Sequence, residues 1–365
     1  MAGGIDGLET VVAAETRLSD VDGERGRLII RGRTLDELVA TSSFEQTIDL
    51  LWEDLFPDLP DDVAFALGRA RVEVFAEVAA LDPVLTMRSP VEATRAMIAR
   101  VVDGDDLATA LRLVAAPAVF TAAHLRLRAG REPVAPDPTL GHARDILRMC
   151  RGAAPSDGEA AALDTYLTTV CDHGLNASTF AARVVASTRA GLTSAVIAGL
   201  SALKGPLHGG APGPVIEMLN AIGEASNAEV WLEAALDRGD RLMGFGHRIY
   251  RVRDPRADAL KRAVHALTRS SNTMPGRLDL AEQVETAALA VLARRKPGRS
   301  LQTNVELYTA LLLEALDFPP DAFTCVFAMG RVAGWIAHAR EQLAGGRLVR
   351  PQSRYIGPAP LEKAA

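Results

Sequence analysis

The amino-acid sequence predicts a mainly α protein, and three observations support that fold class. Of the 365 residues, 48% are hydrophobic but only 5% are aromatic, and the helix-forming residues Ala, Leu, Arg and Glu are abundant. Helix-start signals and apolar i, i+3, i+4, i+7 spacings recur along the chain. The alternation of strands and helices that predicts a parallel sheet does not occur, and one short segment alone has the pattern of strands.

That segment is the first expected element, a small β-hairpin within residues 15–32. Its apolar run, residues 28–30, follows an Asp22-Gly23 turn. A turn of this kind beside a β-branched apolar run is typical of a hairpin. We therefore expect strands near the N-terminus and not elsewhere in the chain.

Helices are expected beyond the hairpin. Ser43 stands three residues before Gln46, which is the spacing of a capping box. Residues 89–92 (Ser-Pro-Val-Glu) combine a cap, a proline at the first helical position and a glutamate at the third. Within residues 215–222 the apolar side chains recur at helical spacing.

Two segments interrupt the helical pattern. Residues 205–214 (GPLHGGAPGP) must end one helix at Gly205-Pro206, and another helix can start at Pro214. So much glycine and proline predicts a hinge at which backbone approaches something that side chains would obstruct. Residues 272–279 (NTMPGRLD) are predicted to form a surface loop.

Charge, cysteine content and hydropathy exclude several classes of protein. The net charge is −6 and no basic block occurs, which argues against nucleic-acid binding. The three cysteines, Cys150, Cys171 and Cys325, form no CxxC motif, as expected in a reduced compartment. Residues 1–12 have no apolar signal region, and the longest apolar stretch, residues 190–203, is too short to span a bilayer. We expect a soluble, cytoplasmic protein.

Two histidines stand where a helical scaffold does not itself require them. His173 lies in the segment DHGLNAST, where it could also be a helix-end histidine held by its neighbours. His208 lies inside the Gly/Pro segment, and the sequence offers no core-packing reason for it. Imidazole can transfer protons near neutral pH. Both residues are therefore candidates for acid–base chemistry, with a structural role as the alternative.

A third candidate segment, GFGHRIYRVRDPR, spans residues 244–256 and contains His247. Its glycines lack the preceding strand and the third glycine of a dinucleotide-binding loop, so they are weak evidence for phosphate binding. Asp254 and Pro255 are typical of a helix start, which places Arg256 in the first turn, where a cation opposes the helix dipole. A bound anion would relieve this conflict. A solvated surface arginine is the alternative.

The fourth candidate is Arg331, the only permanent charge between Ala322 and Ala339. An unpaired guanidinium is costly to bury, so this side chain needs either a ligand carboxylate or a structural salt bridge. Gly330 and Gly334 beside it allow another element or a ligand to approach closely.

Taken together, these histidines and arginines suit chemistry on a dicarboxylate. Arginines can hold carboxylates bidentately, and histidines can transfer protons. A tri-histidine metal site is the competing interpretation. No two of the three histidines stand at i, i+4 and no HxH motif occurs, so we expect no metal ligands.

Four motifs resemble the citrate synthase family in order and spacing: GPLHGGAP, GFGHRIYRVRDPR, NVELY and GRVAGW. The similarity extends from the N-terminal hairpin to RPQSRYIGP, almost the whole chain, and DHGLNAST resembles the shorter bacterial branch that includes methylcitrate synthases. The resemblance implies a two-domain helical homodimer. Residues 1–212 and 315–365 would form the large domain, and residues 213–314 a small domain that closes over the active site.

The resemblance also implies roles for individual residues. His208 matches the histidine that hydrogen-bonds the acyl-CoA carbonyl as it enolises, and His247 matches the one that donates to the oxaloacetate carbonyl. The ligands of oxaloacetate and citrate are matched by His173, Arg256, Arg331 and, across the dimer, Arg350. The CoA contacts are matched by Leu242, Met243, Gly244, Phe245, Gly246 and Arg251.

The position of the general base departs from the commonest family pattern, because Glu306 stands where an aspartate is most familiar. An alternative role for Glu306 is structural, since Thr303 and Glu306 have the spacing of a capping box for a helix beginning at Asn304. The extra methylene would shift the carboxylate, and a misplaced base is costly to rate. We expect Glu306 to be the catalytic base.

The resemblance implies a citrate synthase, which condenses acetyl-CoA with oxaloacetate and water to give citrate and CoA at the entry to the tricarboxylic acid cycle. Two alternatives stay open: a 2-methylcitrate synthase that uses propionyl-CoA, and a catalytically silent CoA-binding paralogue. The expected partners are oxaloacetate, acyl-CoA and a second copy of the chain, without nucleic acid, membrane, metal or redox cofactor.

Overall fold

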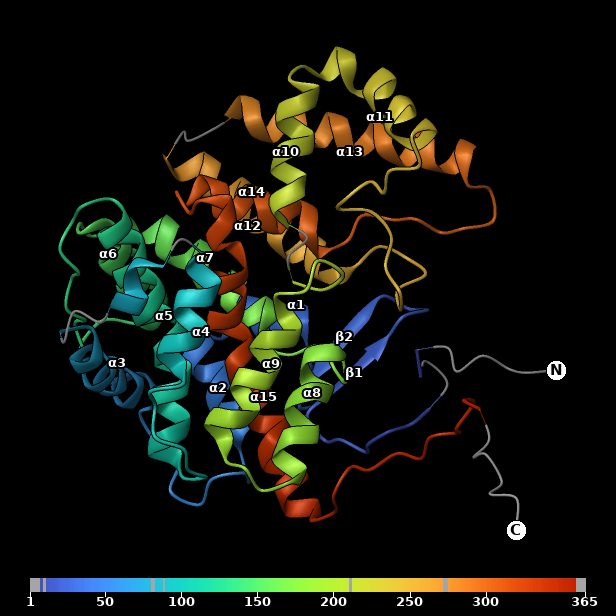
Figure 1. Cartoon of the computed structure of the whole chain (residues 1–365). Coiled ribbons are helices and arrows are strands. Elements are labelled where there is room, and N and C mark those ends of the chain that lie inside the picture. Colours follow the sequence, from blue (N-terminus) through green and yellow to red (C-terminus); the bar gives the residue numbers. More distant parts are fainter. Residues whose placement is uncertain are drawn as a thin grey trace, which may run out of the picture.

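A computed structural model gives the fold and describes residues 7–8, 11–79, 83–87, 89–209, 212–271 and 275–358. These residues form fifteen α-helices, three short 3₁₀ turns and one three-stranded sheet (Figure 1). The mainly α prediction is confirmed.

The sheet contains the predicted hairpin. Strands β1 (Ser19–Asp22) and β2 (Arg27–Ile30) pair antiparallel, with Ser19 opposite Ile30. The turn between them is held by the Asp22 carboxylate, which accepts from the Arg25 amide at 2.9 Å. A third strand, β3 (Arg33–Thr34), pairs with β2 and was not predicted.

The helices follow in two groups, on either side of the Gly/Pro segment. Before it lie α1 (Leu35–Thr41), α2 (Phe44–Trp52), α3 (Val63–Ala79), α4 (Pro90–Ile98), α5 (Leu107–Arg128), α6 (His142–Arg151), α7 (Asp157–Val170), α8 (Ala177–Ser187) and α9 (Leu192–Leu203). After it lie α10 (Pro212–Ile222), α11 (Ala228–Asp237), α12 (Pro255–Ser271), α13 (Pro275–Arg295), α14 (Val305–Ala315) and α15 (Phe323–Gly345). The 3₁₀ turns are η1 (Pro83–Thr86), η2 (Ala225–Asn227) and η3 (Pro320–Ala322).

The predicted helix starts agree with the structure in most places. Ser43 and Gln46 form the expected capping box on α2. Residues 89–92 open α4 with Pro90 in the first turn, although the Ser89 side chain makes no capping hydrogen bond.

The two predicted interruptions differ in outcome. Helix α9 ends at Leu203 and α10 begins at Pro212, two residues before the predicted start, while residues 210–211 lie outside the described residues. The loop predicted at 272–279 is wrong for residues 275–279, because Pro275 starts α13. A proline is compatible with the first helical position, where no backbone donor is needed. Residues 272–274 lie outside the described residues.

Helix α15 forms the centre of the molecule and packs against α2, α5, α7, α8 and α9 (Figure 1). Its side chains from Val332 to Ala339 are buried. Gly330 and Gly334 allow the close contact with α7 and the segment after it. A Cβ would lie 2.8 Å from the Leu167 carbonyl oxygen at Gly330, and 2.2 Å from the Cys171 carbonyl oxygen at Gly334.

Two described helices, α5 and the η3–α15 segment, are long and apolar enough to cross a membrane. Their most apolar windows are 89% and 94% buried in the protein. Core helices of a folded protein pass the same test of length and composition, and the burial of these two agrees with that interpretation.

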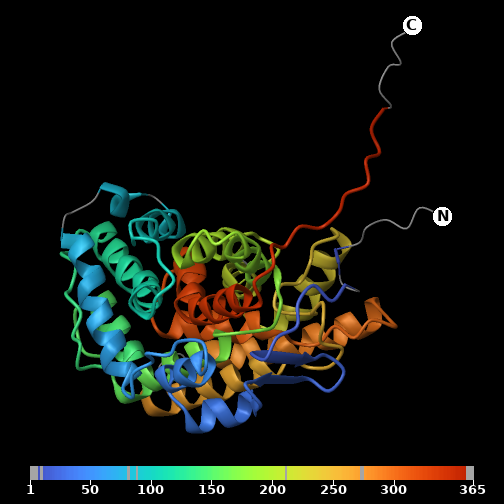
Figure 2. The same cartoon turned by 90° about the horizontal axis from the view of Figure 1, so that it is seen from below.

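Helices α10, α11 and α13 lie together in the upper part of Figure 1. Helices α12 and α14 pack both on neighbours in this group and on α7. The division into a large domain (1–212 and 315–365) and a closing small domain (213–314) stays a prediction. The C-terminal segment after α15 extends away from the body of the molecule (Figure 2).

Candidate functional site

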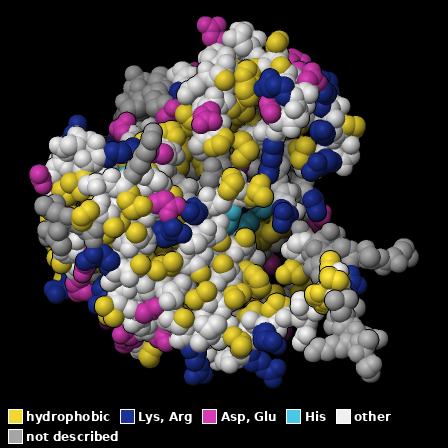
Figure 3. Space-filling model, in the orientation of Figure 1, with side chains coloured by type: hydrophobic (Ala, Val, Ile, Leu, Met, Phe, Trp, Pro, Cys, Tyr) yellow, Lys and Arg dark blue, Asp and Glu magenta, His cyan; other side chains and the backbone are white. Residues whose placement is uncertain are grey.

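Apart from Arg350, the candidate residues come from six parts of the chain: the segment after α7, the turn after α9, the loop before α12, and the helices α12, α14 and α15. Figure 3 shows histidine side chains together at the bottom of a hollow in the surface. Ring contacts, hydrogen bonds and electrostatic effects connect His173, His208, His247, Arg256, Arg331 and Glu306 in one neighbourhood.

His173 is buried and lies beside the residues of the loop before α12. Its Nε2 is 3.1 Å from the Tyr250 hydroxyl, and its ring meets that of His247 edge-on with centroids 5.5 Å apart. Burial lowers the pKa of His173 well below its usual value, and the positive charge of Arg256 lowers it further. His173 is therefore a neutral imidazole at physiological pH.

His247 has its protonation pattern set by the backbone. Its Nδ1 accepts hydrogen bonds from the amides of Ile249 and Tyr250, both at 3.1 Å. Burial, with the charge of Arg256, lowers the pKa of His247 to about 4, so the ring is neutral. A neutral imidazole that accepts at Nδ1 carries its proton on Nε2. Nε2 also lies 3.2 Å from Arg256 Nη2, which is a donor, so with the proton on Nε2 this contact is not a hydrogen bond. A ligand oxygen could accept from both groups.

Arg256 is buried, so it is not the solvated surface arginine that was one alternative. Asp254 pairs with it: the Asp254 carboxylate accepts from Arg256 Nε at 3.0 Å, from Nη2 at 2.8 Å and from its backbone amide at 3.0 Å. Burial alone would lower the pKa of Arg256, but Asp254 raises it above the usual value. The expectation that a bound anion must relieve the charge at the helix start was therefore incomplete, because the capping aspartate does so already.

Arg331 differs from Arg256 because none of the described residues forms an ion pair with it. It is 1% exposed, its Nε donates to the Val170 carbonyl at 2.5 Å, and its guanidinium lies 4.8 Å from the Phe327 ring centre. Among the described residues no carboxylate forms an ion pair with it, although the charge of Asp172 raises its pKa, and Nη2 has no hydrogen-bond partner. Burial lowers the pKa of Arg331 to about 10, which still leaves the group charged at neutral pH. The structural salt bridge considered for Arg331 is therefore not formed with any of the described residues.

His208 lies on the turn after α9. Its Nε2 is 2.8 Å from the Ser178 hydroxyl oxygen. That hydroxyl donates to Asn176 Oδ1 at 2.7 Å and accepts from Trp335 Nε1 at 3.1 Å. Ser178 lies in the first turn of α8, which Asn176 caps by accepting from the Ser178 and Thr179 amides. Burial and the charge of Arg331 lower the pKa of His208 to about 4, so this imidazole is neutral as well.

Glu306 does not form the capping box that was its alternative role. Asn304, not Thr303, caps α14, because the Asn304 side chain accepts from the Glu306 amide at 3.0 Å and the helix begins at Val305. The Thr303 hydroxyl instead donates to Glu285 at 2.6 Å. Burial raises the pKa of Glu306, and its Oε2 is buried without a hydrogen-bond partner among the described residues. The carboxylate is therefore available to accept a proton.

Residues 242–246 form a tight loop beside the start of α14. Phe245 pairs with Thr303 in an isolated bridge, and the Asn304 side chain donates to the Gly246 carbonyl at 2.8 Å. Gly246 has a φ of +80°, which favours glycine there. Arg251 lies further along, with its amide bonded to the Gly23 carbonyl at 2.9 Å and its side chain exposed.

Arg350 does not join the other candidate residues in this chain. It is exposed and lies in the C-terminal segment 347–358, which has no helix or strand and extends from the body (Figure 2). A contribution to the site of a second copy stays a prediction.

The geometry also identifies residues that sequence reasoning missed. Tyr250, Ser178 and Asp254 each touch a candidate side chain directly. Asp254 was singled out only as a cap, and Tyr250 and Ser178 stand inside motifs already quoted. Their roles depend on contacts between distant segments, which spacing along one helix or strand does not reveal.

The fold and the site define a helical protein that can hold an anionic substrate and transfer protons with neutral imidazoles and a carboxylate. No group of three or more His, Cys, Asp or Glu side chains in the described residues could hold a metal ion. A reaction without metal or other cofactor stays a prediction.

Comparison with known proteins identifies the family. The model of the citrate synthase C-terminal domain matches residues 7–352. The chain is 36% identical to a citrate synthase of Haloferax volcanii, over 98% of this chain and 96% of that protein. It is also 36% identical to a 2-methylcitrate synthase of Mycobacterium tuberculosis, over 96% and 90%. The structure of citrate synthase from Thermoplasma acidophilum, a ternary complex with carboxymethyl coenzyme A and oxaloacetate, superposes with a TM-score of 0.85 at 26% identity, covering 98% of this chain and 97% of that one.

The chain belongs to the citrate synthase family, and it is an enzyme that transfers acyl groups, as citrate synthase does. The resemblance seen in the sequence is thereby confirmed over nearly the whole chain.

Proposed function

We propose that this enzyme condenses acetyl-CoA with oxaloacetate and water to give citrate and CoA. The observation that carries the proposal is the buried guanidinium of Arg331, which lacks a carboxylate partner among the described residues and lies in the neighbourhood of three neutral histidines. A buried cation without a counterion is costly unless a ligand supplies the negative charge. The Thermoplasma acidophilum relative was solved with oxaloacetate, which offers two carboxylates.

The negatively charged oxaloacetate would be held by positively charged arginines and by neutral hydrogen-bond donors. Arg331 and Arg256 would take the carboxylates, since planar guanidinium groups bind carboxylates bidentately. His173 would donate to the same ligand. Arg350 of a second copy would complete the pocket, and closure of residues 213–314 over it would exclude water.

Glu306 would remove a proton from the methyl group of acetyl-CoA. Its raised pKa makes the carboxylate a stronger base than an exposed glutamate, provided that it is ionised. His208 would donate to the thioester oxygen as the enol forms. In the structure the Ser178 hydroxyl donates to Asn176 Oδ1 at 2.7 Å, so the neutral His208 donates to Ser178 from Nε2. For His208 to donate to the thioester from Nδ1, the Ser178 hydroxyl would have to turn from Asn176 to His208 Nε2.

The enol carbon would then attack the ketone of oxaloacetate, and His247 Nε2 would donate to the ketone oxygen as it becomes a hydroxyl group. The product, citryl-CoA, would react with water: a carbon–oxygen bond forms, the carbon–sulfur bond breaks, and the thiol of CoA leaves with a proton. Residues 242–246 and Arg251 would hold CoA. Each proton transfer in the condensation has a named side chain, so the proposal requires no metal or redox cofactor.

A 2-methylcitrate synthase that uses propionyl-CoA is the second candidate, favoured by the 36% identity to the Mycobacterium tuberculosis relative. The catalytically silent paralogue is less compatible with the site, because one carboxylate oxygen of Glu306 has no hydrogen-bond partner among the described residues and Glu306 does not act as a cap. We further propose a cytoplasmic homodimer that acts at the entry to the tricarboxylic acid cycle.

The test measures thiol release from acetyl-CoA and from propionyl-CoA, each with and without oxaloacetate. Release should depend on oxaloacetate and should have the higher kcat/KM with acetyl-CoA. His247→Ala should lower kcat by about 10² or more, because it removes a positioned acid. His265→Ala is the matched control, since His265 pairs with Glu282 on α12 and α13. No oxaloacetate-dependent release from either thioester would contradict the proposed function, and a preference for propionyl-CoA would favour the second candidate.

A further inference from the structure

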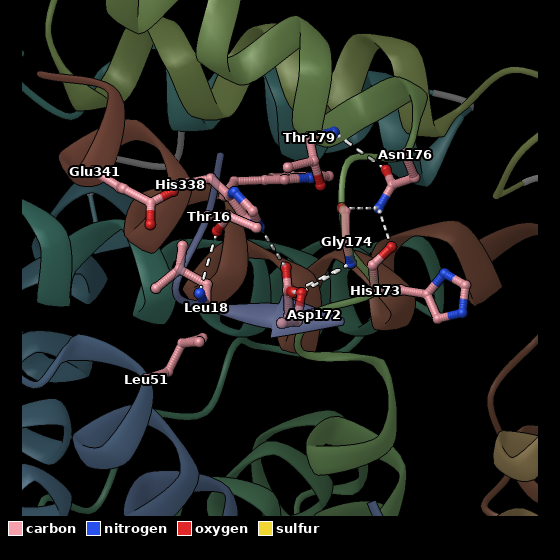
Figure 4. Close-up of polar contacts among 12 residues, drawn as sticks. Thr16, Leu18, Leu51, Asp172, His173, Gly174, Asn176, Thr179, His338 and Glu341 are labelled. Carbon is pink, nitrogen blue, oxygen red and sulfur yellow. Dashed lines mark hydrogen bonds and ion pairs between the residues drawn. The ribbon is translucent and has the colours of Figure 1, made fainter. Parts of the chain in front are cut away.

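Behind His173 lies a second buried polar group that the proposed reaction does not use. It consists of Asp172, Arg183, His338 and Glu341, called here the rear cluster (Figure 4). Figure 4 shows the His173 side chain pointing away from Asp172 and His338, so the two sides of one short segment face different surroundings.

Helix α15 brings the rear cluster to the site. Arg331, Gly334 and His338 are spaced by three and four residues, so they share one face of the helix. The helix lies so close to the segment after α7 that a Cβ at Gly334 would be 2.8 Å from Asp172 Oδ1. The same face that carries the proposed oxaloacetate ligand Arg331 therefore also carries His338.

The Asp172 carboxylate fixes the backbone on either side of His173. Its Oδ2 accepts from the Ser19 hydroxyl and from the Gly174 amide, the latter at 3.2 Å. Its Oδ1 lies 3.1 Å from His338 Nε2, an electrostatic contact rather than a well-aligned hydrogen bond. Although burial would raise the pKa of Asp172, His338 and Ser19 hold it below the usual value, so the group is a carboxylate.

Arg183 determines which nitrogen of His338 carries the proton. Arg183 Nη1 lies 3.0 Å from His338 Nδ1 and donates to Glu341 at 2.6 Å, while its Nε donates to Gln342 at 3.0 Å. A guanidinium has donors only, so His338 Nδ1 must accept. The ring therefore carries a proton on Nε2, which faces Asp172.

We propose that His338 is a positioning residue for oxaloacetate: through Asp172 it holds the 172–174 backbone and thereby the orientation of the His173 ring. This inference rests on the proposed function of His173 as an oxaloacetate ligand. Small displacements of a ligand-holding group reduce binding and rate strongly, because the productive geometry is narrow. A purely structural role for His338 would instead affect stability alone.

Two variants of His338 and one control separate these roles. His338→Phe keeps the ring volume but removes both nitrogens. His338→Gln restores a donor near the position of Nε2. His124→Phe is the matched control, because His124 is also fully buried, on α5, with its Nδ1 2.8 Å from the Leu85 carbonyl and outside the site.

In the full-length enzyme, His338→Phe should raise the KM for oxaloacetate about tenfold or more, with a much smaller change in the KM for acetyl-CoA. His338→Gln should recover most of the loss. His124→Phe should lower Tm without changing either KM. An unchanged KM for oxaloacetate in folded His338→Phe would overturn the inference, as would equal increases in both KM values.

A second measurement keeps this inference separate from the proposed function. If wild-type enzyme releases no thiol, the proposed function fails, and the imidazole ¹⁵N resonances of His173 still report its positioning. They should shift or broaden in unliganded His338→Phe and not in His124→Phe. His173 resonances that stay unchanged in His338→Phe would show that the rear cluster does not position that ring.

Discussion

At the scale of single residues, burial sets the protonation states on which the proposed chemistry depends. It lowers the pKa values of His208 and His247 to about 4, and it raises that of Glu306. Both histidines are then neutral over the whole physiological pH range. Of these three groups, the Glu306 carboxylate titrates nearest to that range. The acid limb of the pH–rate profile should therefore report Glu306.

The first prediction concerns Glu306→Gln. The amide keeps the size of the side chain but cannot take a proton, so kcat should fall by about 10² to 10⁴ while oxaloacetate affinity changes little. A base must be deprotonated, so wild-type kcat/KM should fall as the pH drops through the raised Glu306 pKa, above the ordinary glutamate value of 4.5. Steady-state kinetics from pH 4 to 9 measure both effects.

Glu314→Gln is the control for this prediction, because Glu314 lies on the same helix and pairs with Arg277 away from the site. It should retain wild-type kcat. A fully active Glu306→Gln enzyme would exclude Glu306 as the base, and an acid limb near pH 4 would assign the titration to the histidines instead.

The sequence predicted single residues well where chemistry alone isolates them. Arg331 stands alone in an apolar helix, and the structure leaves its charge unpaired among the described residues. It predicted Arg256 less well, because Asp254 serves both as the cap and as the ion-pair partner. Asp254 already fits the capping pattern in the sequence, so the sequence gives no sign that it also pairs with Arg256.

At the scale of elements, the start of α14 connects a helix cap to the proposed CoA loop. The Asn304 side chain accepts from the Glu306 amide and donates to the Gly246 carbonyl. The cap therefore places the candidate base and the candidate CoA contacts relative to each other. The sequence placed this cap one residue too early because Thr303 with Glu306 also fits the capping pattern.

The second prediction follows for Asn304→Ala. Loss of the cap should destabilise the protein by about 1 kcal/mol. Loss of the Gly246 contact should raise the KM for acetyl-CoA as well. Ser43→Ala removes a comparable cap from α2, which carries none of the candidate residues, and should lower Tm without changing KM. Identical kinetic behaviour of the two variants would show that Asn304 is a cap and nothing more.

The third prediction concerns the contact between α7 and α2. Asp164 accepts from the Phe44 amide at 3.1 Å, and burial together with Glu45 raises its pKa to about 7. Between the usual aspartate value of 3.8 and this pKa, the folded state binds a proton that the unfolded state does not. Raising the pH through this window therefore lowers the stability of the fold.

Asp164→Asn keeps the acceptor and removes the charge. Its Tm should exceed that of wild type at pH 8, and the difference should shrink as the pH is lowered toward 4. Thermal melts at several pH values test this, with exposed Asp61→Asn as the control. Equal Tm values for wild type and Asp164→Asn at pH 8 would mean that the Asp164 carboxylate is well solvated.

At the scale of the whole molecule, the site depends on contacts between segments far apart in the sequence. Trp335 meets Ser178 across 157 residues, and His173 meets Tyr250 across 77. Composition and periodicity predicted helices and many of their ends, because those depend on local chemistry. The arrangement of the helices followed from the family resemblance. Neither the local sequence patterns nor the resemblance predicted the rear cluster, because it depends on the close packing that Gly334 permits.

The last prediction concerns the assembly and Arg350. This residue lies in the exposed segment 347–358, which leaves the body of its own chain, so we expect it to reach the site of a second copy (Figure 2). Arg350→Ala should then weaken oxaloacetate binding without lowering Tm.

Mixed dimers decide which chain supplies the arginine. His208→Ala removes a residue that each site takes from its own chain, whereas Arg350→Ala removes one that each site would take from the other. Each variant alone should have low activity.

In a mixed dimer, the chain with Arg350→Ala keeps its own His208 and receives Arg350 from its partner, so one of the two sites is intact. Unfolding and refolding an equal mixture should therefore restore about a quarter of wild-type activity, because random pairing of a two-fold dimer gives half mixed dimers. If Arg350 serves its own chain, every mixed dimer has two damaged sites and the activity stays at the level of the separate variants. That outcome, with dimers demonstrated by light scattering, would overturn the assignment of Arg350 to the partner's site.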